Sequence, residues 1–167
     1  MVIPAKRVNI VSLELVKESS LLYGPRQCLS IFDAYELVAP FIKNKDREHL
    51  LVVGLNTKNE PTVINIARIG TVNQSIATPR DILKPVLLSN GNRMIVAHNH
   101  PSGNVEPSEE DKQLTKRLQE VGKIIGIELI DHLIVSPNDT YYSFKEAEFI
   151  ESLTLIKKVL GIFYVNH

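Results

Sequence analysis

The chain has 167 residues, and its 19 lysine and arginine residues are balanced by 19 aspartate and glutamate residues. Hydrophobic residues make up 44% and charged residues 23%, which is typical of a globular domain large enough to bury a core. The formal net charge of zero excludes a strongly basic nucleic-acid-binding chain, so we expect weak or no direct binding to DNA.

The cysteine content and the apolar pattern limit the cellular compartments in which we expect the protein. Cys28 is the only cysteine, which excludes an internal disulfide and favours a reducing compartment such as the cytoplasm. We see no signal-peptide pattern at the N-terminus and no apolar stretch long enough to span a bilayer, so no membrane association is expected.

Strand and helix patterns alternate along the chain, and we expect residues 1–167 to form one domain. Turn and cap signals separate these patterns from one another. The expected elements are a strand at 8–18, a helix from Ser30 that bends at Pro40, a hairpin of strands 49–55 and 62–69, a helix from Thr78 to about Ser89, a strand at 93–99, a helix at 108–125, a hairpin of strands 127–135 and 140–144, and an amphipathic segment at about 145–160.

The most informative segment joins the strand at 93–99 to the helix at 108–125. Side chains alternate along a strand, so His98 and His100 point the same way from its C-terminal end. Asp111 lies in the first turn of the helix, on the face of its apolar stripe. Two imidazoles and one carboxylate therefore converge, which predicts a zinc site with its fourth position open.

Simpler explanations exist for each part of this pattern. Ser108 and Asp111 have the spacing of an ordinary N-cap and its N3 acid, and the hydroxyl of Ser108 can both cap the helix and point into the site. The histidines alone can be half-buried polar residues bonded to backbone groups. Neither explanation accounts for an acid and two imidazoles at the two ends of one short loop.

These residues carry a resemblance. The spacing His98-x-His100, seven residues, Ser108, two residues, Asp111 is similar to the JAMM signature of the JAB/MPN metalloprotease domain. The flanking segments resemble its RadC branch, at 98–103, 107–108, 126–132, 55–59, 70–73 and 79–82. The resemblance spans about residues 28–147 and implies a cytidine-deaminase-like α/β fold with a mixed central sheet flanked by helices. RadC proteins usually carry an N-terminal helix-hairpin-helix region, for which we expect too few residues here.

The resemblance also implies roles for the site residues. His98, His100 and Asp111 would bind Zn²⁺, and Glu48 would be the general acid/base for water attacking a peptide or isopeptide bond of a peptide or protein substrate. Ser108 would hydrogen-bond the developing oxyanion. From its sequence context alone, Glu48 is an ordinary charge at the entrance of a strand. The rival interpretation is a non-catalytic RadC-type binding or regulatory module in DNA repair or mobile-element biology, and a homo-oligomer is left open.

A polar pair, Asp131 and His132, interrupts the apolar strand at 127–135. Buried polar groups need hydrogen-bond partners. We favour a structural hydrogen bond elsewhere in the core over the alternative, which is support of the zinc ligands.

Overall fold

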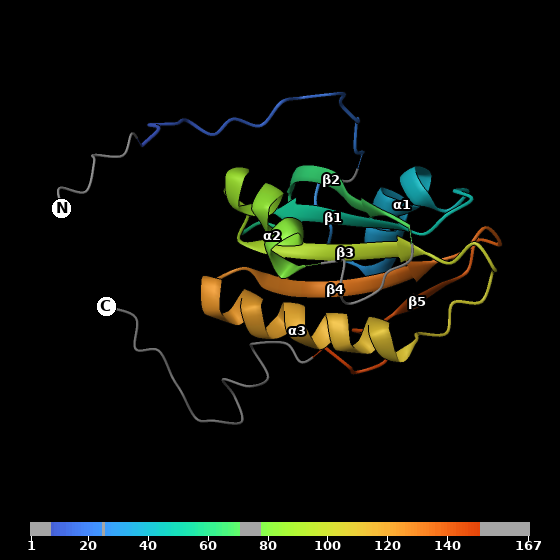
Figure 1. The fold of residues 1–167 in the computed structure, drawn as a ribbon. Helices are drawn as coiled ribbons and strands as arrows, with labels where there is room; N and C mark the ends of the chain where they lie inside the picture. The colour runs from blue at the N-terminus through green and yellow to red at the C-terminus, as the bar shows by residue number, and fades with distance from the viewer. Residues whose placement is uncertain (1–7, 25, 71–77, 151–167) are drawn as a thin grey trace.

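A computed structural model describes residues 8–24, 26–70 and 78–150, in which a mixed β-sheet is flanked by helices (Figure 1). The α/β class predicted from the sequence is confirmed. The elements of these residues are α1 (Ile31–Ile42), β1 (His49–Leu55), β2 (Pro61–Ile69), α2 (Pro79–Leu88), β3 (Arg93–Asn99), α3 (Glu109–Ile125), β4 (Glu128–Val135) and β5 (Tyr141–Ser143).

The strand order of the sheet is β2-β1-β3-β4-β5. Strands β3 and β4 are parallel, whereas the other neighbouring pairs are antiparallel. Because parallel strands need a crossover connection, α3 links β3 to β4. The C-terminal end of β3 and the N-terminal end of α3 therefore lie at the same edge of the sheet, joined by one loop.

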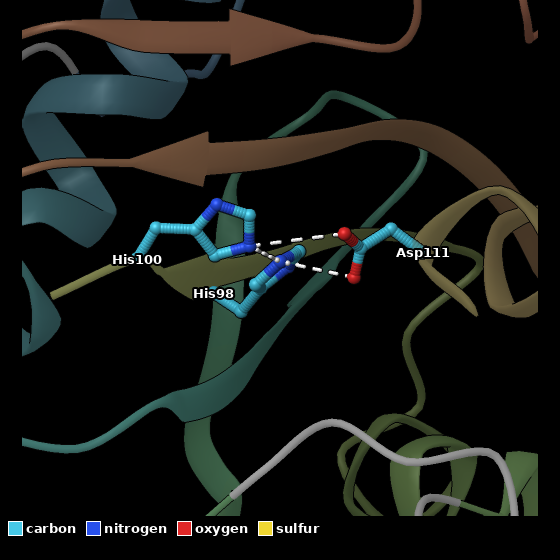
Figure 2. A group of neighbouring side chains, drawn as sticks. All are labelled: His98, His100 and Asp111. Carbon is cyan, nitrogen blue, oxygen red and sulfur yellow. Dashed lines mark hydrogen bonds and ion pairs between the residues drawn. The ribbon is translucent and has the colours of Figure 1, made fainter. Parts of the chain in front are cut away.

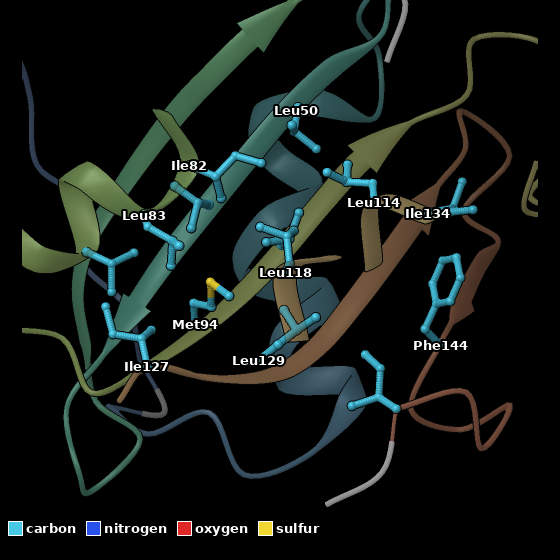
Figure 3. Packing of buried hydrophobic residues seen from close by; sticks show 14 residues of the cluster. Leu50, Ile82, Leu83, Met94, Leu114, Leu118, Ile127, Leu129, Ile134 and Phe144 are labelled. Carbon is cyan, nitrogen blue, oxygen red and sulfur yellow. The ribbon is translucent and has the colours of Figure 1, made fainter. Parts of the chain in front are cut away.

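The two faces of the sheet are covered by different helices, as Figure 1 shows. Strands β1 and β3 are buried along nearly their whole length, and their side chains alternate between the two faces. Leu50 and Val96 pack on the side of α2 and α3, in the cluster drawn in Figure 3. Leu51 and Ala97 pack on the side of α1.

The predicted helix ends are confirmed by the cap geometry. Ser30 and Ser108 form capping boxes at the starts of α1 and α3, and Thr78 caps α2. Gly126 ends α3 in the left-handed conformation, with φ of 77°. None of the helices in the described part of the chain combines the length and apolarity that crossing a membrane requires.

The strand predicted at 8–18 is wrong. These residues are exposed and in no strand, and they take part in none of the strand pairings of the described sheet. Apolar residues occur at both odd and even positions here, for example Ile10 and Val11, so neither face of a strand would gather them. Of the amphipathic segment predicted at 145–160, residues 145–148 form turns and 151–160 lie outside the described residues.

Candidate metal centre

The end of β3 and the first turn of α3 bring His98, His100 and Asp111 together (Figure 2). The Nε2 atom of His98 lies 3.2 Å from Asp111 Oδ1, and that of His100 lies 3.7 Å from Asp111 Oδ2. The two Nε2 atoms are 3.1 Å apart. The side chains of His98 and Asp111 are buried, whereas that of His100 is 16% exposed, so the cluster reaches solvent on the His100 side.

The loop after β3 sets the orientation of His100. Gly103 turns the chain with φ of +87°, and a Cβ atom there would lie 2.9 Å from the Asn138 amide nitrogen. The turn places the Asn104 carbonyl oxygen 2.7 Å from His100 Nδ1. Because a carbonyl can only accept a hydrogen bond, Nδ1 carries the proton of the neutral ring. The unprotonated Nε2 atom of His100 therefore faces Asp111.

The start of α3 sets the orientation of Asp111. Its Oδ2 atom accepts hydrogen bonds from the Ser108 backbone N–H at 2.8 Å and from the Ser108 hydroxyl at 2.7 Å. Burial raises the pKa of the Asp111 carboxyl, but the neighbouring His98 and the hydrogen bonds from Ser108 together lower it by more. The net result is a pKa below the ordinary value, so the side chain is an anionic ligand at neutral pH.

The donor set suits a metal ion. One ligand atom from each of the three residues can be chosen so that all lie within 4.8 Å of one another. The 3.1 Å between the two Nε2 atoms is close to the spacing of about 3.3 Å that a tetrahedral zinc ion with bonds of ~2.0–2.1 Å imposes on its ligands. Two imidazole nitrogens and one carboxylate are a common three-ligand set of zinc enzymes, which leave a further position open. The cluster predicted from the sequence is therefore assembled in the structure and can hold a metal.

Alternation along β1, extended by one residue, predicts that Glu48 shares the face of the sheet on which the cluster lies. Glu48 immediately precedes β1, in which Leu50 is the register partner of His98. Side chains two residues apart share a face, so Glu48 would fall on the side of His98, beyond Leu50 and toward His100. Its side chain is half-buried.

Sequence reasoning missed Asn99, which lies between the two histidines and is fully buried on the opposite face. Its Oδ1 atom accepts the His49 backbone N–H at 2.7 Å. Its amide donates to the carbonyl oxygens of Lys45 at 3.2 Å and Arg47 at 3.0 Å. Asn99 therefore fixes the segment that carries Glu48 against the strand that carries the histidines. A polar residue inside an apolar strand was the available signal.

The two residues of the buried polar pair have different roles: Asp131 makes structural hydrogen bonds in the core, whereas His132 contacts a candidate metal ligand. Asp131 accepts hydrogen bonds from Ser143 Oγ, the Lys145 backbone N–H and the His132 backbone N–H, which is the structural role that the sequence favoured. Burial raises the pKa of Asp131, and these hydrogen bonds partly oppose the shift. His132, by contrast, lies with Nε2 2.9 Å from Nδ1 of His98. Burial and the neighbouring His98 hold the pKa of His132 well below its ordinary value.

Comparison with known proteins places most of the chain in one domain family. A family model described as a RadC-like JAB domain matches residues 29–149. A UPF0758 protein of Rubrobacter xylanophilus is 42% identical over 141 residues, which cover 83% of this chain and 61% of the relative. A UPF0758 protein of Chlorobium chlorochromatii is 39% identical over 72% of this chain and 54% of its own length. A UPF0758 protein of Clostridium botulinum is 46% identical over 68% of this chain and 50% of its own length. The chain thus spans only about half to three fifths of these relatives.

Proposed function

Since the chain belongs to the RadC-like JAB domain family, we propose that it is a zinc-dependent metallohydrolase that cleaves peptide or isopeptide bonds in a peptide or protein substrate. The observation that carries the proposal is the convergence of His98, His100 and Asp111. A purely structural zinc site is closed by four protein ligands, whereas a catalytic one keeps a position open. The single cysteine, which is buried and free, agrees with a place in the cytoplasm.

We assign the proton transfers to Glu48. When bound, a zinc ion supplies a Lewis acid that polarises the substrate carbonyl and acidifies a water molecule. The alternation of side chains along β1 would put Glu48 on the face of His98, where it can take the proton of the attacking water and return it to the leaving amine. Its half-buried position just before β1 leaves part of the side chain accessible to solvent, which supports this role.

We assign the stabilisation of the oxyanion to Ser108, which is exposed at the start of α3. In the structure its hydroxyl proton is donated to Asp111 Oδ2. Acting on substrate requires this proton to turn away from Asp111, while the Ser108 backbone N–H keeps its own hydrogen bond to the same oxygen. The helix start therefore stays capped while the hydroxyl changes partner.

The engaged hydroxyl of Ser108 also favours one rival, a non-catalytic RadC-type module in DNA repair or mobile-element biology. In that case Ser108 only caps α3, and the metal site holds the loop to the helix. The two functions differ in one measurable way, because only the hydrolase turns over an amide substrate and loses turnover without loss of metal when Glu48 is changed.

Metal analysis together with a peptide-library digest tests the proposal. We expect about one zinc per chain in the purified protein, loss of zinc in the double variant His98→Ala/His100→Ala, and cleavage that a chelator stops and added zinc restores. Glu110→Gln is the matched control, because Glu110 is an exposed carboxylate next to Asp111 and its loss should leave the zinc content unchanged. Full zinc occupancy in the folded double variant, checked by circular dichroism, would contradict the site. Zinc binding without any cleavage would favour the non-catalytic module.

A further inference from the structure

A chain of hydrogen bonds lies behind the candidate metal ligands and connects two of them. His98 Nδ1 is 2.9 Å from His132 Nε2 on β4. His132 Nδ1 is 2.7 Å from the hydroxyl of Thr115 on α3, and this hydroxyl is 2.7 Å from the backbone carbonyl oxygen of Asp111. All four residues are buried.

The direction of every hydrogen bond in this chain follows from its last member. The Asp111 carbonyl can only accept, so the single hydroxyl proton of Thr115 is donated to it. The Thr115 oxygen must then accept from His132, which places the proton of that neutral ring on Nδ1. His132 Nε2 is left as an acceptor, and the proton that it shares with His98 belongs to Nδ1 of His98.

We infer that His132 is a positioning residue of the metal site, held by Thr115 in the one tautomer that accepts from His98. A neutral His98 with its proton on Nδ1 presents an unprotonated Nε2 atom to the site, where that atom lies 3.2 Å from Asp111 Oδ1. The hydrogen bond to the outer nitrogen of a ligating histidine fixes its tautomer and its orientation. This inference rests on the proposed metal site, but it makes a separate claim about the protons.

Packing and strand register hold His132 in place for this role. Its ring stacks on Phe144 with the ring centroids 4.8 Å apart and the planes 10° from parallel. Between Met94 and Ile95 the β3–β4 pairing shifts by one residue, because Met94 pairs with Leu129 whereas Ile95 pairs with Asp131. Without this bulge at residue 130, the side-chain alternation would turn His132 to the face opposite His98.

The first experiment reads the tautomer directly and needs no metal. Long-range ¹H–¹⁵N correlation spectra of the metal-free protein at neutral pH report which imidazole nitrogens carry protons. We expect His132 to be protonated on Nδ1 and unprotonated on Nε2, whether or not the protein proves to bind zinc. Thr115→Val should remove this preference, whereas Thr115→Ser, which keeps the hydroxyl, should preserve it. Protonation of His132 on Nε2 in the wild-type protein would overturn the inference.

The second experiment measures zinc affinity by competition with a chromophoric chelator. His132→Phe removes the acceptor but keeps an aromatic ring against Phe144, and we expect zinc to bind about 10–100-fold more weakly. His132→Gln, whose amide oxygen can accept from His98, should recover part of the loss. Phe144→Leu separates packing from hydrogen bonding, because it removes the ring stacked on His132 but no hydrogen bond, so we expect a smaller loss of zinc affinity than in His132→Phe.

The outcomes separate this inference from the proposed function. Wild-type zinc affinity in a folded His132→Phe variant would overturn the positioning role. If His132→Phe does not fold, the comparison of Thr115→Val with Thr115→Ser decides in the same way, since equal zinc affinities would overturn the role. If the wild-type protein binds no zinc, the proposed function fails, and the tautomer of His132 is still decided by the spectra.

Discussion

The carboxylate of Asp111 and the hydroxyl of Ser108 satisfy one another. Ser108 Oγ donates to Asp111 Oδ2 at 2.7 Å and accepts the Asp111 backbone N–H at 3.1 Å. The same carboxylate directs Oδ1 toward His98 at 3.2 Å. The Asp111 side chain therefore belongs both to the cap of α3 and to the candidate metal site. A substitution that disturbs the cap should also change metal binding.

Ser108→Ala should lower the free energy of unfolding by about 1 kcal/mol through loss of the cap, and it should also weaken zinc binding because Asp111 loses a donor. Chemical denaturation and chelator competition measure the two effects. Ser30→Ala is the matched control, since Ser30 forms the same capping box at α1, away from the site. We expect it to cost similar stability and to leave zinc affinity unchanged. Equal zinc affinities of the two variants would refute the coupling.

Glu48→Gln should retain zinc and lose about 10²–10⁴ of the hydrolysis rate, because the amide cannot take up a proton. Zinc content and initial rates on a peptide found in the library digest check both parts. Asp46→Asn changes an exposed carboxylate in the same segment, and we expect it to keep both the zinc content and the hydrolysis rate of the wild type. Turnover at the wild-type rate by a zinc-bound Glu48→Gln protein would remove Glu48 from the mechanism.

Asn99→Ala should leave the buried His49 N–H without its acceptor and cost about 1–3 kcal/mol of stability. Because the segment at 45–49 then loses its attachment to β3, we also expect slower hydrolysis with zinc retained. Denaturation curves, zinc analysis and rates are the measurements. Asn65→Ala, at an exposed position of β2, serves as the control, and we expect it to leave stability, zinc content and hydrolysis rate unchanged. An Asn99→Ala variant with a full hydrolysis rate would show that Glu48 does not depend on Asn99.

The parts of the site that the sequence predicted are those set by local rules. Alternation along β3 placed His98 and His100 on one face, and the capping pattern placed Asp111 at the start of α3. Continuous apolar runs gave β1 and β3 their predicted bounds of 49–55 and 93–99. Each of these inferences needs only residues within a few positions of one another.

The parts that could not be predicted depend on how strands pair. The role of His132 follows from a bulge at residue 130, and single-sequence alternation has no way to place such an insertion. The hydrogen bonds of Asn99 reach back about 50 residues, to the loop before β1. The strand predicted at 8–18 failed for a different reason: its apolar residues fall at both odd and even positions, so the segment has no single apolar face to pack against the protein.

Asp131 should give the protein a distinctive pH dependence. Burial raises its folded-state pKa above the unfolded value of about 3.9, so its contribution to stability is present below that unfolded pKa and is lost as pH rises through the folded pKa. Asp131→Asn lacks this titration. We therefore expect the stability of the variant relative to the wild type to improve as the pH is raised from about 4. Urea denaturation at several pH values measures it, and a difference that is constant with pH would contradict the raised pKa.

Binding to duplex DNA should be weak and without sequence preference. Affinity for nucleic acid comes largely from phosphates neutralised by lysine and arginine, and here 19 such residues are offset by 19 acidic ones. Three exposed glutamates, Glu106, Glu109 and Glu110, flank the candidate metal site and would repel phosphates there. Fluorescence anisotropy at near-physiological salt measures the affinity. Replacing the three glutamates by lysine should strengthen binding and steepen its salt dependence, which shows that the assay detects a basic surface. Submicromolar affinity of the wild-type protein for duplex or branched DNA would instead favour a repair module over the hydrolase.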